Sequence, residues 1–338
     1  AFAKTEAEIL AKLQQLRGVA ARHGGRIVPI GILPTLRKTD FGPHCITRRR
    51  RYHALVEQLI RRRGDKFHIE INGDDPLKLE LADITLEGAN TSFQVHYRVT
   101  PGNYADTFNA MQLLTPLAVA ISANSPTLFG HRLWQETRIP LFKQSIDTRH
   151  TDRYGWREPA RVSFGQGWAR RGAGELFQEV VRIYPPLLPV CSDVSPSQEQ
   201  TDAVTPSLAE LRLHQGTVWL WNRPIYDDAG GGHLRIEMRA LPAGPTAIDM
   251  VASAAFMIGL AEGLRPRIND LLPAQPFAIA EYNFYRAAQH GLDARLLWPD
   301  AGQSGYRERG VMEIATALLP TAWAGLRASG VDADEADH

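Results

Sequence analysis

The clearest alternation of apolar and polar side chains lies between residues 234 and 239. The apolar positions are Leu234, Ile236 and Met238, and the charged positions are Arg235, Glu237 and Arg239. Successive side chains of a β-strand point to opposite faces, so the pattern predicts a strand with one apolar face and one charged face. On an open sheet this would be an ordinary solvated face, which is the commoner case. In a cleft, Glu237 would offer oxygens to a hard cation, and the arginines would offer forked donors to a phosphate or carboxylate.

A second β-type run, residues 217–224, precedes this strand and ends in Asn222-Arg223-Pro224. The connection, residues 227–232, contains two aspartates and three consecutive glycines, a composition typical of a turn. The two runs therefore predict a hairpin that brings Arg223 close to the charged face.

Residues 82–99 predict two further strands, interrupted at Gly88. In the second strand, Ser92, Gln94 and His96 alternate with apolar residues and so share one polar face. Glu87 precedes the glycine, which often marks a bulge that redirects its neighbours, so Glu87 is expected to turn towards the same cleft. Taken alone, a histidine such as His96 is more often a hydrogen-bonded structural residue than a metal ligand.

Helical periodicity recurs along the rest of the chain. Predicted helices cover residues 5–23, 48–63, 104–122, 247–264, 277–290 and 307–328. Residues 26–35 predict a strand that runs into a loop, and residues 161–174 and 191–207 predict loops. The last three helices carry few convergent polar groups, so residues 247–330 are interpreted as a helical layer behind the sheet. Length alone allows one large domain or two.

Composition and motifs give no support to nucleic-acid, membrane, zinc or dinucleotide-binding proteins. The chain has 338 residues, with 38 Lys and Arg against 37 Asp and Glu, so its charge balance demands neither a nucleic-acid nor a membrane partner. Cys45 and Cys191 lack zinc or disulfide spacing, which favours a reducing, cytoplasmic setting. The most apolar runs, near residues 111–123 and 250–260, are shorter than the roughly 20 residues of a membrane span. Neither a dinucleotide-binding glycine motif nor a P-loop is present.

The helix at residues 48–63 carries arginine clusters at both ends, at residues 48–51 and 61–63. Such clusters occur in nucleic-acid-binding helices. They occur also on solvated or subunit-facing helices, and no aromatic platform accompanies them in this sequence. Nucleic-acid binding is therefore the less favoured interpretation, and a homo-oligomer is left open.

Several of these segments are similar to the same known family. The run WNRP, a short turn and HLRIEMRALPAGPTAID, together with GILPT, EGANTSFQVH and ANSP, resemble the ATP-dependent carboxylate-amine ligases of the glutamate-cysteine ligase type 2 family. The resemblance implies an α+β, glutamine synthetase-like catalytic fold that forms a single domain over residues 1–338. In this fold a curved, mostly antiparallel sheet presents the site on its concave face and helices back it. It implies ATP and Mg²⁺ as cofactors and an acyl-phosphate intermediate.

The resemblance also implies roles for particular residues. The metal ligands would be Glu87, His96 and Glu237. The catalytic arginines, which would hold phosphate or substrate carboxylate, would be Arg235, Arg239 and Arg223. The substrate-binding residues would be Gln94, Asn124, Ser125, Arg138 and Arg149. Because Mg²⁺ prefers carboxylate and water ligands, His96 is the least favoured of the three candidate metal ligands.

The chain departs from the family pattern in two respects. The family's early strand with closely spaced glutamates is not found, and the chain starts at Ala1-Phe2-Ala3, which predicts a trimmed or internally started polypeptide. Trp221 stands where many relatives carry an acidic residue. The sequence therefore predicts an ATP- and Mg²⁺-dependent ligase acting on a small-molecule amino acid and an amine. A non-catalytic relative that binds a nucleotide or a partner is the alternative.

Overall fold

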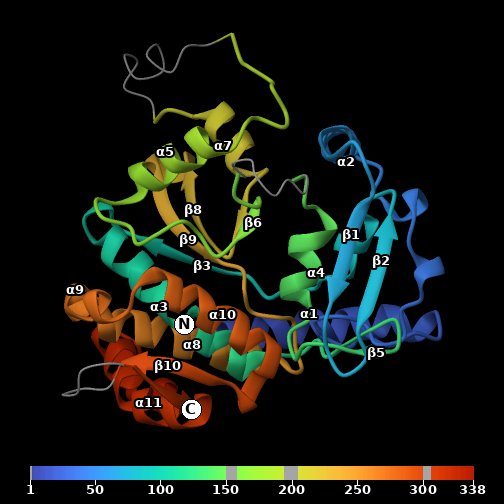
Figure 1. Ribbon diagram of the computed structural model, residues 1–338. Helices are drawn as coiled ribbons and strands as arrows, with labels where there is room; N and C mark the ends of the chain where they lie inside the picture. The colour runs from blue at the N-terminus through green and yellow to red at the C-terminus, as the bar shows by residue number, and fades with distance from the viewer. Residues whose placement is uncertain (1, 150–157, 194–204, 300–305) are drawn as a thin grey trace.

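Helix α3 (Tyr104–Ser122) runs through the centre of the protein in the computed structural model, which describes residues 2–149, 158–193, 205–299 and 306–338. The helix is apolar on nearly all sides, as expected for a helix enclosed by other elements. Its neighbours on one side are α8 (Ala247–Leu264) and α10 (Phe277–His290). The sheet that contains residues 234–238 lies on its other side (Figure 1).

Further helices and strands are built around this centre. The other helices are α1 (Phe2–Arg22), α2 (Arg50–Arg63), α4 (Arg138–Ser145), α5 (Ala173–Ile183), α7 (Ala209–Gln215), α9 (Ile268–Leu271), α11 (Val311–Ala328) and α12 (Ala333–Asp337). The strands are β1 (Phe67–Ile71), β2 (Leu77–Leu81), β3 (Val95–Val99), β4 (Thr127–Leu128), β5 (His131–Arg132), β6 (Val162–Ser163), β7 (Trp219–Leu220), β8 (Asn222–Asp227), β9 (His233–Met238), β10 (Arg295–Pro299) and β11 (Tyr306–Gly310).

The sheet that positions the site is antiparallel and has the strand order β3-β9-β8. Ile236 and Met238 of β9 are almost fully buried in the main hydrophobic core, and Leu234 packs against it. The hairpin between β8 and β9 turns at residues 229–231, within the predicted connection. The predicted strand, its alternating faces and its hairpin are therefore confirmed.

The rest of the β structure forms small separate sheets among the described residues. The pairs β1-β2, β4-β5 and β10-β11 are antiparallel, and β6-β7 is parallel. The α+β class and the mostly antiparallel pairing are thus confirmed, whereas the glutamine synthetase-like fold stays a prediction. The hairpin β1-β2 was not predicted, although its apolar residues alternate regularly, because its short runs lie between charged residues.

Two predicted strands are wrong. Residues 85–89 form the 3-10 helix η3 (Thr85–Ala89), whose buried residues Leu86 and Ala89 are three apart, as one helical turn requires. Residues 26–35 form no strand, because Gly31 bonds instead to two loops: its amide donates to Asn124 O and its carbonyl accepts from Thr91 N.

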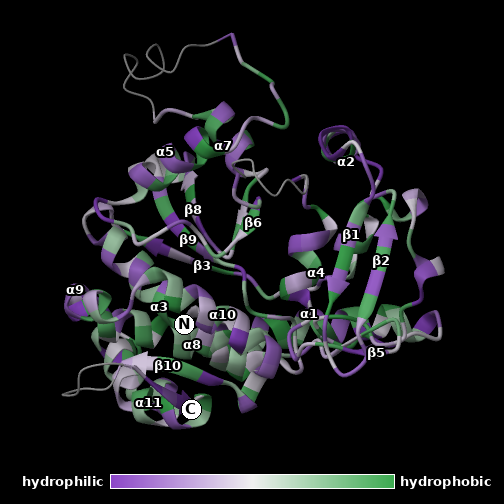
Figure 2. Ribbon diagram, viewed as in Figure 1, coloured by the Kyte–Doolittle hydropathy of each residue, from purple (hydrophilic) through white to green (hydrophobic). Residues whose placement is uncertain are grey.

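The predicted layer at residues 247–330 contains α8, α10 and α11, and the hairpin β10-β11 interrupts it. Glycines let α8 and α11 pack closely, since a Cβ at Gly325 would lie 1.9 Å from Gly259 O. Figure 2 shows many hydrophobic residues along the ribbons of this layer, whereas the distant helix α2 is mostly hydrophilic. The stretch Ala247–Ala274 is longer than the predicted apolar run and apolar enough to cross a membrane by length and composition. Half of its most apolar window is buried inside the protein, and a single helix of this kind is weak evidence for a membrane span.

Candidate active site

Three ionisable side chains form one row across the central sheet. Glu237 on β9 lies directly opposite His96 on β3 and Arg223 on β8. Oε2 of Glu237 accepts a hydrogen bond from Nε of Arg223 at 2.6 Å. Oε1 of Glu237 lies 3.6 Å from Nε2 of His96. Side chains opposite each other in an antiparallel sheet share a face, so the register fixes this cluster.

Arg239 completes the cluster one pleat further along the same face. One of its terminal nitrogens lies 3.5 Å from Oε1 of Glu237, and its guanidinium lies 5.9 Å from the ring centroid of Phe142. Burial lowers the pKa of Arg239 to about 10, with the nearby charge of Arg223 acting in the same direction. Its Nε has no hydrogen-bond partner within the described part of the chain. A buried guanidinium with an unused donor is suited to an incoming anion.

Glu237 is charged despite being only 3% exposed. Its burial opposes ionisation, but Arg223 and Arg239 outweigh that effect and hold the pKa of Glu237 below its ordinary value. The pKa of His96 is also lowered, because burial and the surrounding arginines outweigh the attraction of Glu237. His96 is therefore mainly neutral at pH 7, and two arginines share one carboxylate.

Glu87 approaches the same region from η3. Burial in apolar surroundings raises the pKa of Glu87, and the positive charge of Arg239 opposes this only in part. The carboxyl group belongs to the wall of a large cavity, together with Gln94 and Arg223. A carboxyl group with a raised pKa in a cavity is a frequent feature of functional sites.

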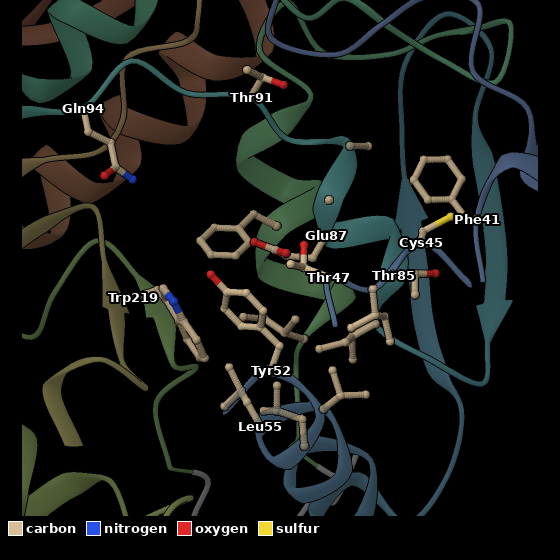
Figure 3. Close-up of a pocket in the computed structure, with 18 of the residues that line it drawn as sticks. Phe41, Cys45, Thr47, Tyr52, Leu55, Thr85, Glu87, Thr91, Gln94 and Trp219 are labelled. Carbon is tan, nitrogen blue, oxygen red and sulfur yellow. The ribbon is translucent and has the colours of Figure 1, made fainter. Parts of the chain in front are cut away.

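The cavity has a volume of about 1370 Å³ and lies between the sheet and helix α2. Tyr52 and Leu55 extend into it from α2, and Trp219 and Gln94 line the opposite side (Figure 3). Its walls combine apolar and aromatic side chains with polar and charged ones, among them Glu87, Gln94 and Arg223, and a mixed lining of this kind can bind and orient a small molecule. Its volume exceeds that of one drug-sized ligand, so it has room for more than one substrate.

A comparison with protein families relates the sequence to a known family. Residues 1–324 match the model of the family described as glutamate-cysteine ligase family 2. The chain belongs to the glutamate-cysteine ligase family 2. A search of curated proteins found no match.

The metal site predicted for a family 2 ligase can be tested against these contacts. Within residues 2–149, 158–193, 205–299 and 306–338, no three His, Cys, Asp or Glu side chains converge as metal ligands. Both oxygens of Glu237 already face guanidinium groups, and Glu87 is coupled to Arg239 rather than to His96. These residues fit an anion better than a divalent cation, so no catalytic step is assigned to a metal held by them.

Three of the predicted substrate-binding residues, Asn124, Ser125 and Arg138, form a largely buried junction. Oγ of Ser125 donates to Glu136 Oε1 at 2.9 Å, and Nε of Arg138 lies 2.6 Å from the same oxygen. Arg138 is 2% exposed and also donates to the carbonyl of Ala240 at 2.6 Å. Asn124 donates through Nδ2 to the carbonyl of Ala243 at 2.9 Å. These residues hold the segment after β9 against α4, and none of them belongs to the cavity wall.

Arg149 also lies outside the cavity wall. Its guanidinium binds both carboxylate oxygens of Asp147, at 2.8 and 2.6 Å, and this hydrogen bonding raises the pKa of Arg149. Arg235 on β9 pairs with Asp227 at 2.9 Å. Trp221 is 2% exposed, and its ring centroid lies 5.9 Å from that of Phe142.

Sequence reasoning missed the aromatic walls of the cavity. The periodicity places Tyr52 in the buried stripe of a basic helix and Trp219 in an ordinary strand. Because both residues fitted the predicted helix and strand, no pattern in the sequence pointed to a cavity between them. Arg62 and Arg63 of α2 are engaged within the chain, Arg62 with Glu158 at 2.6 Å and Arg63 with the carbonyl of Lys66 at 3.0 Å. These contacts weaken the nucleic-acid interpretation of the helix.

Proposed function

We propose that this protein is an ATP- and Mg²⁺-dependent carboxylate-amine ligase that works through an acyl phosphate. Family membership supports the ligase class. The observation that carries the proposal is the pair of guanidiniums, Arg223 and Arg239, that share the buried carboxylate of Glu237 beside a cavity of about 1370 Å³. We further propose that the chain has the glutamine synthetase-like fold of such ligases.

The reaction needs stabilisation of negative charge at this point. A substrate carboxylate oxygen attacks the terminal phosphorus of ATP, the bond to the bridging oxygen breaks, and ADP leaves. The substrate amine then attacks the acyl carbon, phosphate leaves, and the nitrogen loses a proton. In the first step, negative charge spreads over the oxygens of the transferred phosphoryl group, and positioned cationic donors stabilise it.

Glu237 and the residues around it divide these tasks. Glu237 positions Arg223 and Arg239, and their remaining donors face the phosphoryl group or the substrate carboxylate. Arg223 belongs to the cavity wall, so it meets ligands directly. Gln94 helps to orient the substrates, and Glu87 presents a carboxyl group in the same cavity. Magnesium usually arrives with the nucleotide phosphates and keeps several waters, so magnesium dependence does not require these residues to form a metal site.

The experiment measures ADP release from purified protein with ATP, MgCl₂ and a panel of amino acids, singly and in pairs. A pair that releases ADP and forms an amide product supports the proposal. ATP binding without ADP release with any pair would favour the non-catalytic relative. Retention on DNA that falls with salt and is lost when residues 48–51 are neutralised would favour nucleic-acid binding instead.

A further inference from the structure

The apolar stripe of helix α2 lines the large cavity. Its members recur at the three- and four-residue spacing of one helical face, and they are Tyr52, Leu55, Val56 and Leu59. Leu59 is almost fully buried, whereas the other three side chains are only partly buried. A helix usually covers such a stripe with its own core. The part of this stripe that stays accessible is therefore available to an apolar ligand in the cavity.

The side of the cavity opposite α2 is also apolar. Trp219 lines it, and the wall continues through Phe142 of α4 and Ile146 just after that helix. The rings of Phe142 and Trp219 meet edge to face, with their centroids 6.2 Å apart. These residues and the leucines of the α2 stripe belong to one continuous hydrophobic cluster. The surface suits a bulky apolar group, because burial of apolar area is what stabilises binding there.

This apolar surface begins at the charged cluster. The guanidinium of Arg239 lies 5.9 Å from the ring centroid of Phe142. Arg223 lies in the wall of the same cavity as Phe142 and Trp219. A substrate that reacts beside the two guanidiniums can therefore place an apolar side chain directly against these rings.

Glu87 supplies a polar anchor in the same cavity. Its carboxyl group has no hydrogen bond or ion pair with any residue that the structure describes, and only the charge of Arg239 favours its ionised form. In Figure 3, Tyr52 extends from α2 towards the region where Glu87 lies. A carboxylate in such a wall needs a counter-charge, and the ammonium form of an amine offers both a positive charge and N–H donors. A substrate carboxylate would be repelled at this point.

We propose that the amine substrate of this ligase carries a bulky apolar side chain, either aromatic or branched aliphatic. The side chain lies between the α2 stripe and Trp219, and the amino group lies at Glu87, within reach of the acyl group that Arg223 and Arg239 hold. The inference rests on the proposed function, and it adds the class of amine that the enzyme uses.

The test measures ADP release by the whole chain with ATP, MgCl₂ and pairs of amino acids. Mass spectrometry of the product shows which member of each pair supplied the nitrogen. With the same carboxylate partner, phenylalanine and leucine should have kcat/KM values about tenfold or more above those of alanine, serine and cysteine, as expected when a large apolar side chain is buried.

Variants of Tyr52 locate the contact. Tyr52→Ala should lower kcat/KM for phenylalanine about tenfold, and it should leave kcat/KM for alanine and the KM for ATP unchanged. Tyr52→Phe keeps the ring and loses only the hydrogen bond from Arg51, at 2.9 Å on the surface, so it should retain the use of phenylalanine. Tyr282→Ala, at a tyrosine of α10 that is 44% exposed and lies outside the cavity wall, is the matched control and should change none of these values.

The outcomes separate this inference from the proposed function. No ADP release with any pair overturns both. ADP release in which alanine, serine or cysteine is used as well as phenylalanine overturns the inference alone. A product in which phenylalanine supplied the carboxyl group, or a raised KM for ATP in Tyr52→Ala, likewise overturns it, because the apolar wall would then hold another ligand. If Tyr52→Ala does not fold, the ranking of amines by the wild type decides.

Discussion

Glu237 and Arg223 face each other across adjacent strands, and Nε of Arg223 lies 2.6 Å from Oε2 of Glu237. Both side chains are largely buried, with exposures of 3% and 14%. A carboxylate in this position does more than neutralise charge, because it fixes the direction in which the remaining donors of Arg223 and Arg239 point. The activity and the stability of the protein should therefore both depend on the charge of Glu237.

Glu237→Gln should abolish ATP-dependent ligation while the protein remains folded. The arginines lose their shared counter-charge, and a buried pair that loses one partner costs about 3 kcal/mol of the free energy of unfolding. ADP release and urea denaturation measure the two effects. The control is Glu80→Gln on β2, where Glu80 forms an exposed pair with Lys66. This substitution should change the free energy of unfolding by less than about 1 kcal/mol. Undiminished turnover of the Glu237 variant would exclude its assigned role.

The same variant should change the pH dependence of stability. The pKa of Glu237 is depressed in the folded protein, so its stabilising contribution is fully present above its ordinary value of 4.5. That contribution is lost as the pH falls through the folded pKa. The free energy of unfolding of the wild type should therefore fall more steeply than that of Glu237→Gln below pH 4.5. If the free energy of unfolding fell equally steeply in acid for both proteins, this prediction would be wrong.

Arg239→Lys should slow ligation although the positive charge is kept. A lysine has no planar fork, so it cannot reproduce a two-point contact with phosphate or carboxylate. We expect a loss of around 2–4 kcal/mol in transition-state stabilisation, measured as kcat/KM for ADP release. Arg309→Lys, at a pair near the surface with Glu313, is a control that should leave kcat/KM unchanged. Equal kcat/KM values for the wild type and Arg239→Lys would exclude a two-point contact of Arg239 in the transition state.

Glu87→Gln should stabilise the protein at neutral pH. Burial raises the pKa of Glu87, so the wild type loses stability as the pH rises from 4.5 through the folded pKa. A glutamine has no charged form and escapes that loss. The melting temperature of the variant should exceed that of the wild type at pH 7, and the difference should disappear below pH 4.5. Lower activity together with higher stability would fit a functional carboxyl group, whereas a lower melting temperature at pH 7 would contradict the burial argument.

Arg138→Gln should destabilise the protein by about 3–5 kcal/mol, because it leaves buried Glu136 without its counter-ion. Arg149→Gln removes a partly exposed pair and should cost about 1 kcal/mol or less. Thermal or urea unfolding compares the two variants. A direct role of Arg138 in substrate binding would instead appear as a raised KM in a variant of near wild-type stability.

Local patterns anticipated a substantial part of the fold. The alternation at residues 234–239 predicted β9 and its faces, and the glycine-rich turn predicted its hairpin with β8. Helical periodicity predicted α1, α2, α3, α8, α10 and α11. The errors came from short segments such as η3, where buried residues three apart fit either a helical turn or an irregular strand. Element type is weakly encoded in runs of five residues, and contacts distant in sequence decide it.

The sequence by itself determined which residues share a face, because the periods of strand and helix are local properties. It also carried the family signatures. Only the tertiary structure decided which faces meet: it set His96, Glu237 and Arg223 in one row, withdrew Arg138 into a buried junction, and placed Tyr52 of α2 in the wall of a cavity. Strand register and burial arise from contacts between residues far apart in the chain, and no local pattern encodes them.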